Sequence, residues 1–424
     1  MTRRASPRLG AYAGLAALGL LASLVLGLPE LVVLAAPFAL LLAAGLALGR
    51  APQLEVEASV ERERALEGEE LEAEIRIASE SAVERLEVLL ALPPGLETRP
   101  NESPVAIRLA PGEKRTLELH VHCARWGGYT PGEVALRAHD RLGLFRFEAI
   151  VDRRMPLRVY PRPELLLSLL KPLETQVFAG NQVARSKGDG IEFADIRPFV
   201  AGDRPRRVNW RASARRGELV VNEHHPERNT DVIVFLDSFV EARGEEAGTL
   251  DLTVRAAAAL AEGYLRRKDR VGIVGFGGIL RWLLPGTGLV QLYRILDAIV
   301  DTEVVLNFAW KDIDVLPSRT LPPKALVVAL TPLLDERAVG ALLDLRARGF
   351  DLAVVEVSPV PFTAPGQDET DQLAYRIWRH RRAALRYRFQ RAGVAVAEWH
   401  EGEALAAGLE EVASSRRGAR VARG

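Results

Sequence analysis

The sequence predicts a mixed α/β protein that combines an N-terminal transmembrane helical hairpin, an antiparallel β-sandwich and a doubly wound parallel sheet. Three patterns lead to this prediction: two long uncharged stretches near the N-terminus, alternating apolar and polar residues over 53–160, and apolar strands alternating with helical segments from Asp231 onward. A chain of 424 residues is long enough for two or three domains with cores of their own.

The N-terminal stretches predict a two-helix anchor over residues 1–50. Residues 10–28 and 31–49 are each 19 residues long and uncharged, and only Glu30 lies in the turn between them. About 20 apolar residues cross a bilayer as a helix. Arginines lie outside the hairpin, at Arg3, Arg4, Arg8 and Arg50. The positive-inside rule therefore predicts a protein of the inner (cytoplasmic) membrane whose soluble domains face the cytoplasm. A cleaved signal peptide is the alternative, but a second spanning-length segment directly behind the first favours the anchor.

Residues 51–160 predict the β-sandwich. Apolar residues alternate with charged residues in Leu71–Ile77 and with polar ones in Thr116–His122, as in strands with one buried face. Turn signals such as Pro93-Pro94-Gly95 and Pro131-Gly132-Glu133 separate these runs. Short strands at this spacing are typical of a β-sandwich of about 100 residues.

The parallel sheet is predicted over 231–413, after a connector over 161–230. The predicted strands are Val232–Leu236, Val271–Phe276, Ala325–Leu330, Leu352–Val357 and Val394–Ala397. The predicted helices between them are Leu250–Arg267, Leu289–Val300, Glu336–Arg348 and Thr370–Arg391. Nearly continuous apolar strands are typical of a parallel sheet covered on both faces. Residues 414–424 are basic and are predicted to form a disordered tail.

Charge and cysteine content exclude some classes of function. The 56 basic residues balance the 56 acidic ones, so no global charge draws the chain to nucleic acid. Cys123 is the only cysteine, which excludes an intrachain disulfide and fits a reducing compartment.

The most unusual feature is a dense polar run over residues 188–238 that leads into the apolar strand ending at Asp237. Residues 185–216, which overlap the start of this run, contain nine basic and four acidic residues. Arginine–carboxylate pairs commonly hold irregular segments in place, which favours an ordered plug in which Trp210 packs and Asp203 clamps the turn after Gly202. The alternative is a ligand site for a phosphate-bearing or acidic partner.

An enzyme is the other class to consider. Ser213 lies close in sequence to His224 and His225, with Asp203 available to orient a histidine, and nucleophilic catalysis needs a hydroxyl beside such a base. The sequence has no Walker-type loop, no zinc-binding spacing and no HExxH motif. A hydrolase using Ser213 and His224 or His225 is therefore a minor alternative.

The polar run resembles the bacterial family known as domain of unknown function 58. The matching residues are Gly190, Glu192, Phe193, Arg197, Gly202, Asp203, Arg207, Trp210, Ser213, Ala214, Arg215, Leu219 and Glu223, followed by the strand ending at Asp237. Two membrane helices and a β-rich segment also begin the members of this family, so the resemblance covers essentially the whole chain. It implies a von Willebrand factor A-like domain that works with a MoxR-type AAA ATPase.

That fold usually carries a metal-ion-dependent adhesion site, in which hydroxyls and carboxylates hold Mg²⁺. The resemblance assigns Asp237, Thr287 and Thr331 to this site, but Phe239 and Glu241 occupy the two serine positions of its first loop. The expected function is therefore that of a non-enzymatic interaction or scaffold protein with a degenerate site, binding no nucleic acid. A Mg²⁺-dependent adhesion-type binding protein is the alternative.

Overall fold

The computed structural model describes residues 1–172, 192–200, 203, 205, 208–225, 231–245, 247–304, 321–322 and 324–421. The chain divides into two compact units, Met1–Arg162 and Pro163–Gly424. Each unit has its own hydrophobic core.

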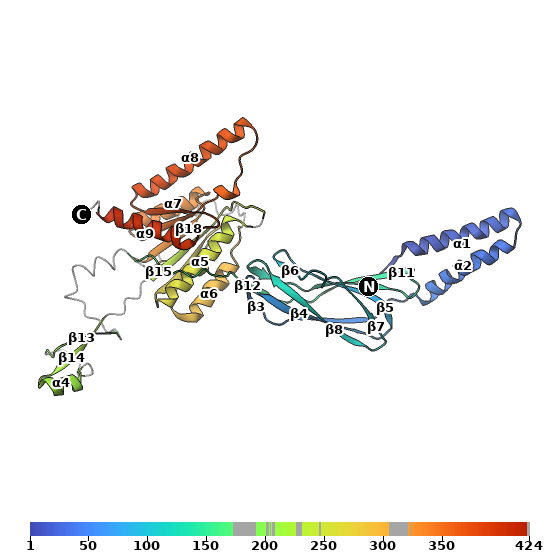
Figure 1. Cartoon of the computed structure of the whole chain (residues 1–424), viewed down its shortest axis with the longest axis horizontal. Coiled ribbons are helices and arrows are strands. Elements are labelled where there is room, and N and C mark those ends of the chain that lie inside the picture. The colour runs from blue at the N-terminus through green and yellow to red at the C-terminus, as the bar shows by residue number, and fades with distance from the viewer. Residues whose placement is uncertain are drawn as a thin grey trace. The chain divides into compact units, whose positions relative to one another are not determined.

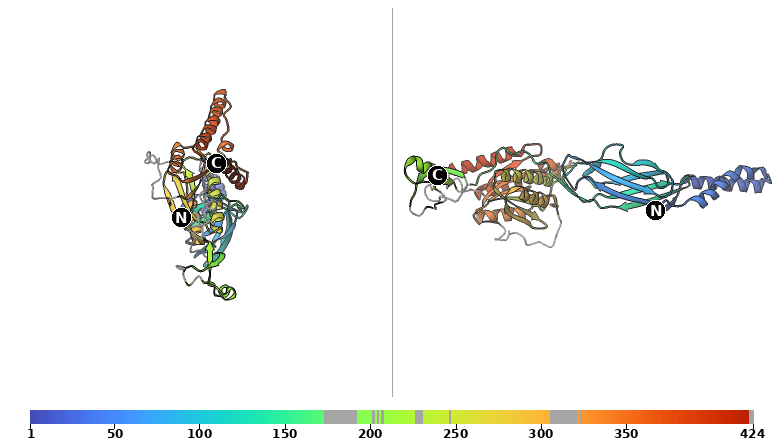
Figure 2. Two further views of the ribbon diagram at one scale, coloured as in Figure 1. Left: turned by 90° about the vertical axis from the view of Figure 1, so that its left-hand side faces the viewer. Right: turned by 90° about the horizontal axis from the view of Figure 1, so that it is seen from below.

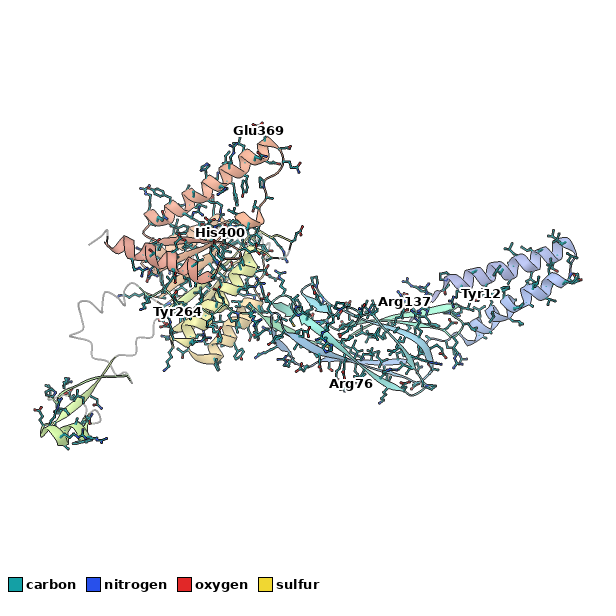
Figure 3. All side chains as sticks on the ribbon, in the orientation of Figure 1. Tyr12, Arg76, Arg137, Tyr264, Glu369 and His400 are labelled. Carbon is teal, nitrogen blue, oxygen red and sulfur yellow. The ribbon has the colours of Figure 1, made fainter. Side chains whose placement is uncertain are left out.

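The first unit begins with a short strand and two long apolar helices. β1 (Thr2–Ala5) precedes α1 (Pro7–Leu26) and α2 (Glu30–Leu48). The two helices are long and apolar enough to cross a membrane. They lie side by side in Figures 1 and 2, and Tyr12, labelled in Figure 3, stacks against Phe38 between them.

The rest of the first unit is an antiparallel sandwich. Its strands are β2 (Leu54–Val60), β3 (Arg64–Leu66), β4 (Glu70–Ser79), β5 (Val83–Ala91), β6 (Leu96–Thr98), β7 (Val105–Leu109), β8 (Lys114–Cys123), β9 (Gly127–Tyr129), β10 (Glu133–His139), β11 (Phe145–Asp152) and β12 (Leu157–Tyr160). The main sheets have the orders β1-β11-β10-β5-β7 and β2-β4-β8-β6, and β3-β12-β9 forms a small third sheet. Inward-facing residues of both main sheets, such as Ile75 and Val88, pack in one core. Along each strand, buried residues alternate with residues that face solvent.

The edge strand β1 was not predicted, because the sandwich was expected to begin at residue 51. β1 pairs antiparallel with β11, from Thr2 opposite Glu148 to Ala5 opposite Phe145. The amide of Ser6 then donates to the carbonyl oxygen of Leu144 (2.8 Å), and Arg3 lies 3.5 Å over the Phe145 ring. The residues on either side of the helical hairpin therefore belong to one domain.

The second unit contains a six-stranded sheet of order β17-β16-β15-β18-β19-β20. The strands are β15 (Asp231–Ser238), β16 (Arg270–Gly277), β17 (Arg281–Gly286), β18 (Leu326–Thr331), β19 (Asp351–Val357) and β20 (Ala395–Trp399). Only β17 is antiparallel to its neighbour. In chain order this is 3-2-1-4-5-6, the arrangement of a doubly wound sheet.

Helices cover both faces of this sheet. They are α5 (Thr249–Arg266), α6 (Gly288–Val300), α7 (Glu336–Ala347), α8 (Glu369–Arg391) and α9 (Leu405–Val421), with a 3₁₀ turn, η2, at Val360–Phe362. Phe235 of β15 packs in one cluster with Leu342 of α7 and Phe389 of α8, while α5 and α6 contact each other on the opposite face. The five predicted strands and four predicted helices coincide with these elements to within a few residues.

The predicted disordered tail at 414–424 is wrong for the part of it that the structure describes. α9 continues to Val421, and Arg416 within it is buried and forms a two-oxygen ion pair with Asp351 (2.7 and 2.6 Å). A buried guanidinium paired this way holds the end of the helix against the sheet. Composition alone could not indicate this, because Asp351 lies 65 residues away in sequence.

The polar run forms a small separate element. β13 (Glu192–Pro198) and β14 (Val220–His225) pair antiparallel, and α4 (Trp210–Arg216) lies between them in sequence. Asn209 caps α4 by accepting from the amide of Ala212, and Gly217 ends it in the left-handed conformation that glycine favours.

Candidate functional site

The second unit has a topological switch point between β15 and β18. The chain leaves β15 toward α5 on one face of the sheet and leaves β18 toward α7 on the other. Open α/β sheets bind ligands at such points, beyond the carboxyl ends of the strands. Asp237 lies near the end of β15 and Thr331 ends β18, so the topology brings these two predicted residues together.

The two side chains form a closed hydrogen-bond network. The hydroxyl of Thr331 donates to Asp237 Oδ2 (2.6 Å), and the amide of Phe239 donates to Asp237 Oδ1 (3.1 Å). The amide of Leu333 donates to the Thr331 hydroxyl (2.9 Å). Asp237 is 2% exposed and Thr331 is fully buried. Both carboxylate oxygens therefore have partners inside the protein.

Burial dominates the protonation of Asp237. It raises the pKa of this carboxyl to about 7. The hydrogen bonds from Thr331 and Phe239 oppose the rise, nearby Asp335 adds to it, and Arg337 opposes it. A carboxyl with this pKa is partly protonated at neutral pH, which weakens it as a metal ligand.

An aromatic ring packs in the core directly after the strand that carries Asp237. Phe239 is 5% exposed and packs edge-on against Phe276, with ring centroids 5.0 Å apart. The Arg337 guanidinium lies 4.1 Å over the Phe239 ring and pairs with Asp335 (2.8 Å). Since Asp335 is engaged by Arg337, the carboxylate nearest the third loop is also committed within the protein.

Thr287 does not join this site, contrary to the expectation. Gly286, just before it, pairs with Val271 at the start of β16, whereas Asp237 pairs with Phe276 near the end of that strand. Five residues of extended strand separate the two levels, about 17 Å. The prediction failed because β17 runs antiparallel to β16. Thr287, which precedes α6, therefore lies near the amino ends of the parallel strands, opposite to Asp237.

The first-loop positions do not supply the missing ligands. Ser238 follows Asp237 in the strand, so its side chain points to the other face, and it packs where Gly277 has no side chain. Glu241 lies 3.3 Å from Arg243 through one oxygen, and its other oxygen is buried without a hydrogen-bond partner in the described structure. Among the described residues, no three His, Cys, Asp or Glu side chains gather in a way that could hold a metal. These residues do not fit the octahedral oxygen shell that Mg²⁺ requires.

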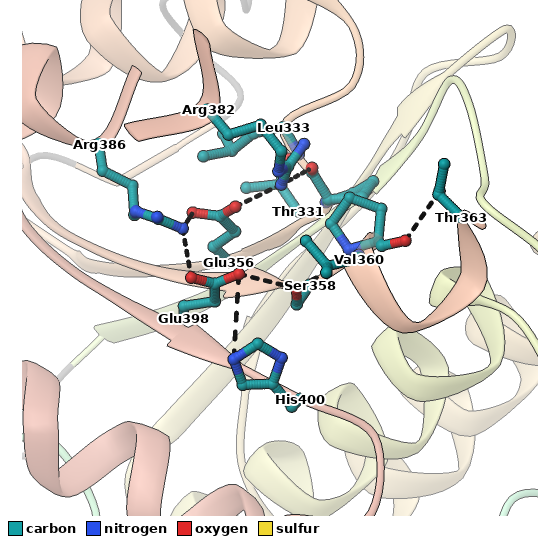
Figure 4. Close-up of polar contacts among 12 residues, drawn as sticks. Thr331, Leu333, Glu356, Ser358, Val360, Thr363, Arg382, Arg386, Glu398 and His400 are labelled. Atoms are coloured by element: carbon teal, nitrogen blue, oxygen red, sulfur yellow. Dashed lines mark hydrogen bonds and ion pairs between the residues drawn. The ribbon is translucent and has the colours of Figure 1, made fainter. Parts of the chain in front are cut away.

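A second buried polar cluster, not predicted from the sequence, lies at the ends of β19 and β20 (Figure 4). Glu356 is fully buried and pairs with Arg382, which also donates to the carbonyl oxygen of Pro332 (2.8 Å). Arg386 bridges Glu356 (3.2 Å) and Glu398. Burial raises the pKa of Glu356, and the two arginines oppose that rise. The cluster holds α8 against the sheet. The sequence feature that could have predicted it is Glu356, a carboxylate near the end of an apolar strand.

Within the polar run, Asp203 forms an ion pair and closes a turn from Val200 to Asp203, whereas the predicted turn after Gly202 lies outside the described residues. Arg197 contacts both oxygens of Asp203, each at 2.6 Å, and the amide of Val200 donates to Asp203 Oδ2 (2.9 Å). A bidentate pair combined with a backbone bond fixes the turn that follows β13. Arg207 and the side chain of Glu192 lie outside the described residues, and Arg215 is exposed on α4.

Trp210 of the polar run does not pack as predicted. We expected it to pack, but it is 68% exposed at the start of α4. The interior of this small element is instead occupied by Val208, Val220 and Val221, together with Ser213. A two-stranded hairpin with one short helix encloses little volume, so the large ring remains outside.

Ser213 makes a contact between α4 and β14. Its oxygen accepts from the amide of Val220 (3.0 Å) and its hydroxyl faces the carbonyl oxygen of the same residue (3.4 Å), which ties α4 to β14. His224 lies four residues further along β14, about 13 Å in an extended strand. The backbone of His225 lies further still, and the side chains of both histidines fall outside the described set.

Comparison with known proteins gives a family match over part of the chain. Residues 195–360 match the family described as "Protein of unknown function DUF58". "Uncharacterized protein YeaD" of Bacillus subtilis (strain 168) is 25% identical over 189 residues, which cover 44% of this chain and 46% of that protein. The chain thus spans less than half the length of this curated relative.

Two solved structures resemble the chain over about a quarter of its length. The cupredoxin domain of amoB from Nitrosocaldus yellowstonii is 13% identical, with a TM-score of 0.20, over 28% of this chain and 94% of that chain. A β-glucosidase from Listeria innocua in complex with isofagomine is 16% identical, with a TM-score of 0.14, over 26% and 16% of the respective chains. TM-scores this low support no argument about fold or function.

Proposed function

We propose that this chain is a membrane-anchored, non-enzymatic protein-interaction protein whose von Willebrand factor A-like domain has a degenerate metal-ion-dependent adhesion site. The observation that carries the proposal is the closed switch point. Asp237 accepts hydrogen bonds from Thr331 and from the amide of Phe239 and is 2% exposed. A carboxyl in this state offers neither a metal ligand nor an accessible base, so binding through the protein surface is the function left to the domain.

The pairing of β1 supports a retained anchor. Signal cleavage after α1 would remove β1 and expose the edge of β11 that it now covers. Because β1 and β2 flank the helical hairpin within one domain, both ends of the hairpin lie on the same side of a membrane that it spans. The arginines at the two ends favour the cytoplasmic side of the inner membrane.

The surface that we propose for binding is an apolar edge formed by β17 and α6. Four large side chains define this edge patch: Trp282 (52% exposed), Leu284 (60%), Leu289 (73%) and Val290 (75%). Grouped apolar side chains exposed at one edge of a domain commonly mark a protein-binding site. The partner that we propose is a MoxR-type AAA ATPase, on the strength of the family resemblance and the match over residues 195–360.

Recovery of the partner from membranes tests this proposal. We expect a Leu289→Asp/Val290→Asp double variant of the tagged full-length chain to recover at least tenfold less partner than the wild type. EDTA should leave wild-type recovery unchanged. Leu373→Asp is the matched control, since Leu373 is exposed on α8 of the same unit and should tolerate the charge.

Three outcomes would contradict the proposal. Loss of the partner on chelation, restored by Mg²⁺, would support the adhesion-type alternative. Equal recovery by the double variant and the control would exclude the edge patch as the binding surface. Failure of Ser213→Ala to complement a deletion strain, although the variant accumulates and folds normally, would support the hydrolase alternative.

A further inference from the structure

A pocket of about 640 Å³ lies where the helical hairpin meets the sandwich. Three segments line it: the end of α2 with the following residues 49–53, the β4–β5 turn at residues 80–84, and the β10–β11 turn at residues 139–142. Its size is within the range of ligand pockets. All of its walls belong to the first unit.

Close packing holds the walls of this pocket in place. A side chain on Gly45 would come within 2.2 Å of Leu144, and one on Gly49 within 3.0 Å of Phe145. These two glycines therefore allow α2 to rest directly on the start of β11. The amide of Ser6, at the other end of the hairpin, bonds to Leu144 as well (2.8 Å). The pocket is preformed, which lowers the cost of binding.

The position of the pocket suits an amphiphile. Gly45 and Gly49 are one helical turn apart, about 6 Å, and α2 ends at Leu48. If α2 spans the bilayer, the pocket extends from the end of the hydrocarbon region into the headgroup region. Apolar walls from Leu142 and Phe147 are continuous with the charged part.

The charged lining carries both signs. Several of its charged groups already have partners within the protein. Asp140 accepts a hydrogen bond from the amide of Phe145 (3.1 Å), and Glu84 forms an ion pair with Arg108 (2.8 Å). Arg50 and Glu80 have no ion pair among the described residues. One guanidinium and one carboxylate thus remain available on the wall of one pocket.

We propose that this pocket binds the headgroup of a phospholipid that carries both a phosphate and an ammonium, as phosphatidylethanolamine does. Arg50 binds the phosphate by charge-assisted hydrogen bonds, and Glu80 binds the ammonium. The lipid fills the space between α2 and the two turns. This inference rests on the proposed membrane anchor, since only a membrane-embedded hairpin brings the pocket to the level of the headgroups.

Native mass spectrometry of the full-length protein, purified from membranes in detergent, tests the site. We expect one tightly held phospholipid on the wild type, with phosphatidylethanolamine preferred over phosphatidylglycerol when the two are added in equal amounts. Arg50→Gln should weaken retention of both lipids about tenfold or more, because a hydrogen bond to a charged group is lost. Glu80→Gln should reduce only the preference for phosphatidylethanolamine. Arg115→Gln, an exposed arginine on β8 away from the pocket, is the control and should behave like the wild type.

Two measurements separate the possible failures. Loss of the wild type from membranes on carbonate extraction would overturn the anchor, and the lipid site with it. Stable membrane integration with equal lipid retention by Arg50→Gln and Arg115→Gln, at equal melting temperatures, would overturn the site alone. Displacement of the lipid by inorganic phosphate as readily as by glycerophosphoethanolamine would overturn the headgroup assignment.

Discussion

Replacing Arg382 by Met tests whether the buried cluster at the ends of β19 and β20 holds α8 to the sheet. The substitution keeps most of the side-chain volume but removes the guanidinium that pairs with Glu356. Glu356 is fully buried and Arg382 is 4% exposed. Breaking a buried pair by removing one partner costs about 3–5 kcal/mol, because the other charge is left uncompensated. Arg386 still lies 3.2 Å from Glu356, so we expect a loss near the lower end, about 3 kcal/mol.

The dependence of this loss on pH identifies its cause. Burial already raises the pKa of Glu356, and Arg382 opposes that rise, so Arg382→Met should raise the pKa further. A carboxyl whose pKa is higher in the folded state binds more protons there than in the unfolded chain. The variant should therefore lose stability as pH rises toward the folded pKa of Glu356 and recover it as pH falls.

Urea unfolding of the full-length chain in detergent, followed by hydrogen exchange in α8 peptides at pH 5.5 and pH 8, measures both effects. Arg379→Met is the matched control, because Arg379 is exposed on the same helix and forms no ion pair among the described residues. Adding Glu356→Gln to Arg382→Met should recover part of the loss, since a neutral amide is easier to bury. A deficit no larger than that of Arg379→Met, or one that does not shrink at low pH, would refute the reasoning.

Three further substitutions test other contacts. Asp237→Asn should remove a pH dependence of stability. Because the pKa of Asp237 is raised from 3.8 to about 7, the wild type should lose about 4 kcal/mol of stability between about pH 4 and pH 7. The melting temperature of the variant should therefore change less across that range. Arg416→Met should cost about 3–5 kcal/mol by removing the guanidinium from a buried ion pair with Asp351, seen as faster hydrogen exchange in α9. Arg197→Lys should lose one of the two contacts with Asp203 and destabilise the hairpin by about 1–2 kcal/mol, seen as faster limited proteolysis between β13 and β14.

Much of the second unit could be predicted from the sequence because its strands are buried on both faces. Runs such as Val232–Leu236 and Leu352–Val357 are almost wholly apolar, and helical periodicity fills the intervals between them. The residue at the end of the first strand, Asp237, could therefore be placed at the carboxyl ends of the parallel strands. This inference needs only local pattern and the rules for parallel connections, whereas Thr331 was assigned by the family resemblance.

The errors have other origins, and the missed strand β1 depends on a partner that is distant in sequence. The edge to which Thr287 belongs depends on the direction of β17, which its composition does not reveal. β1 is only four residues long and gains its strand conformation from β11, 146 residues away at Thr2. Trp210 was expected inside because large aromatic residues are usually buried, but β13, β14 and α4 leave no room for it.

Phe239 belongs to the buried packing around the switch point. It is 5% exposed, and its backbone amide donates to Asp237 Oδ1 (3.1 Å). The phenyl ring packs on Phe276 and lies under the Arg337 guanidinium. Burial of the Asp237 carboxyl raises its pKa to about 7. The amide of Phe239 and the Thr331 hydroxyl donate to the two carboxylate oxygens of Asp237, and the amide of Leu333 donates to that hydroxyl. Both oxygens of Asp237 are thus bonded within the buried core, and the degenerate adhesion site that we propose rests on these contacts.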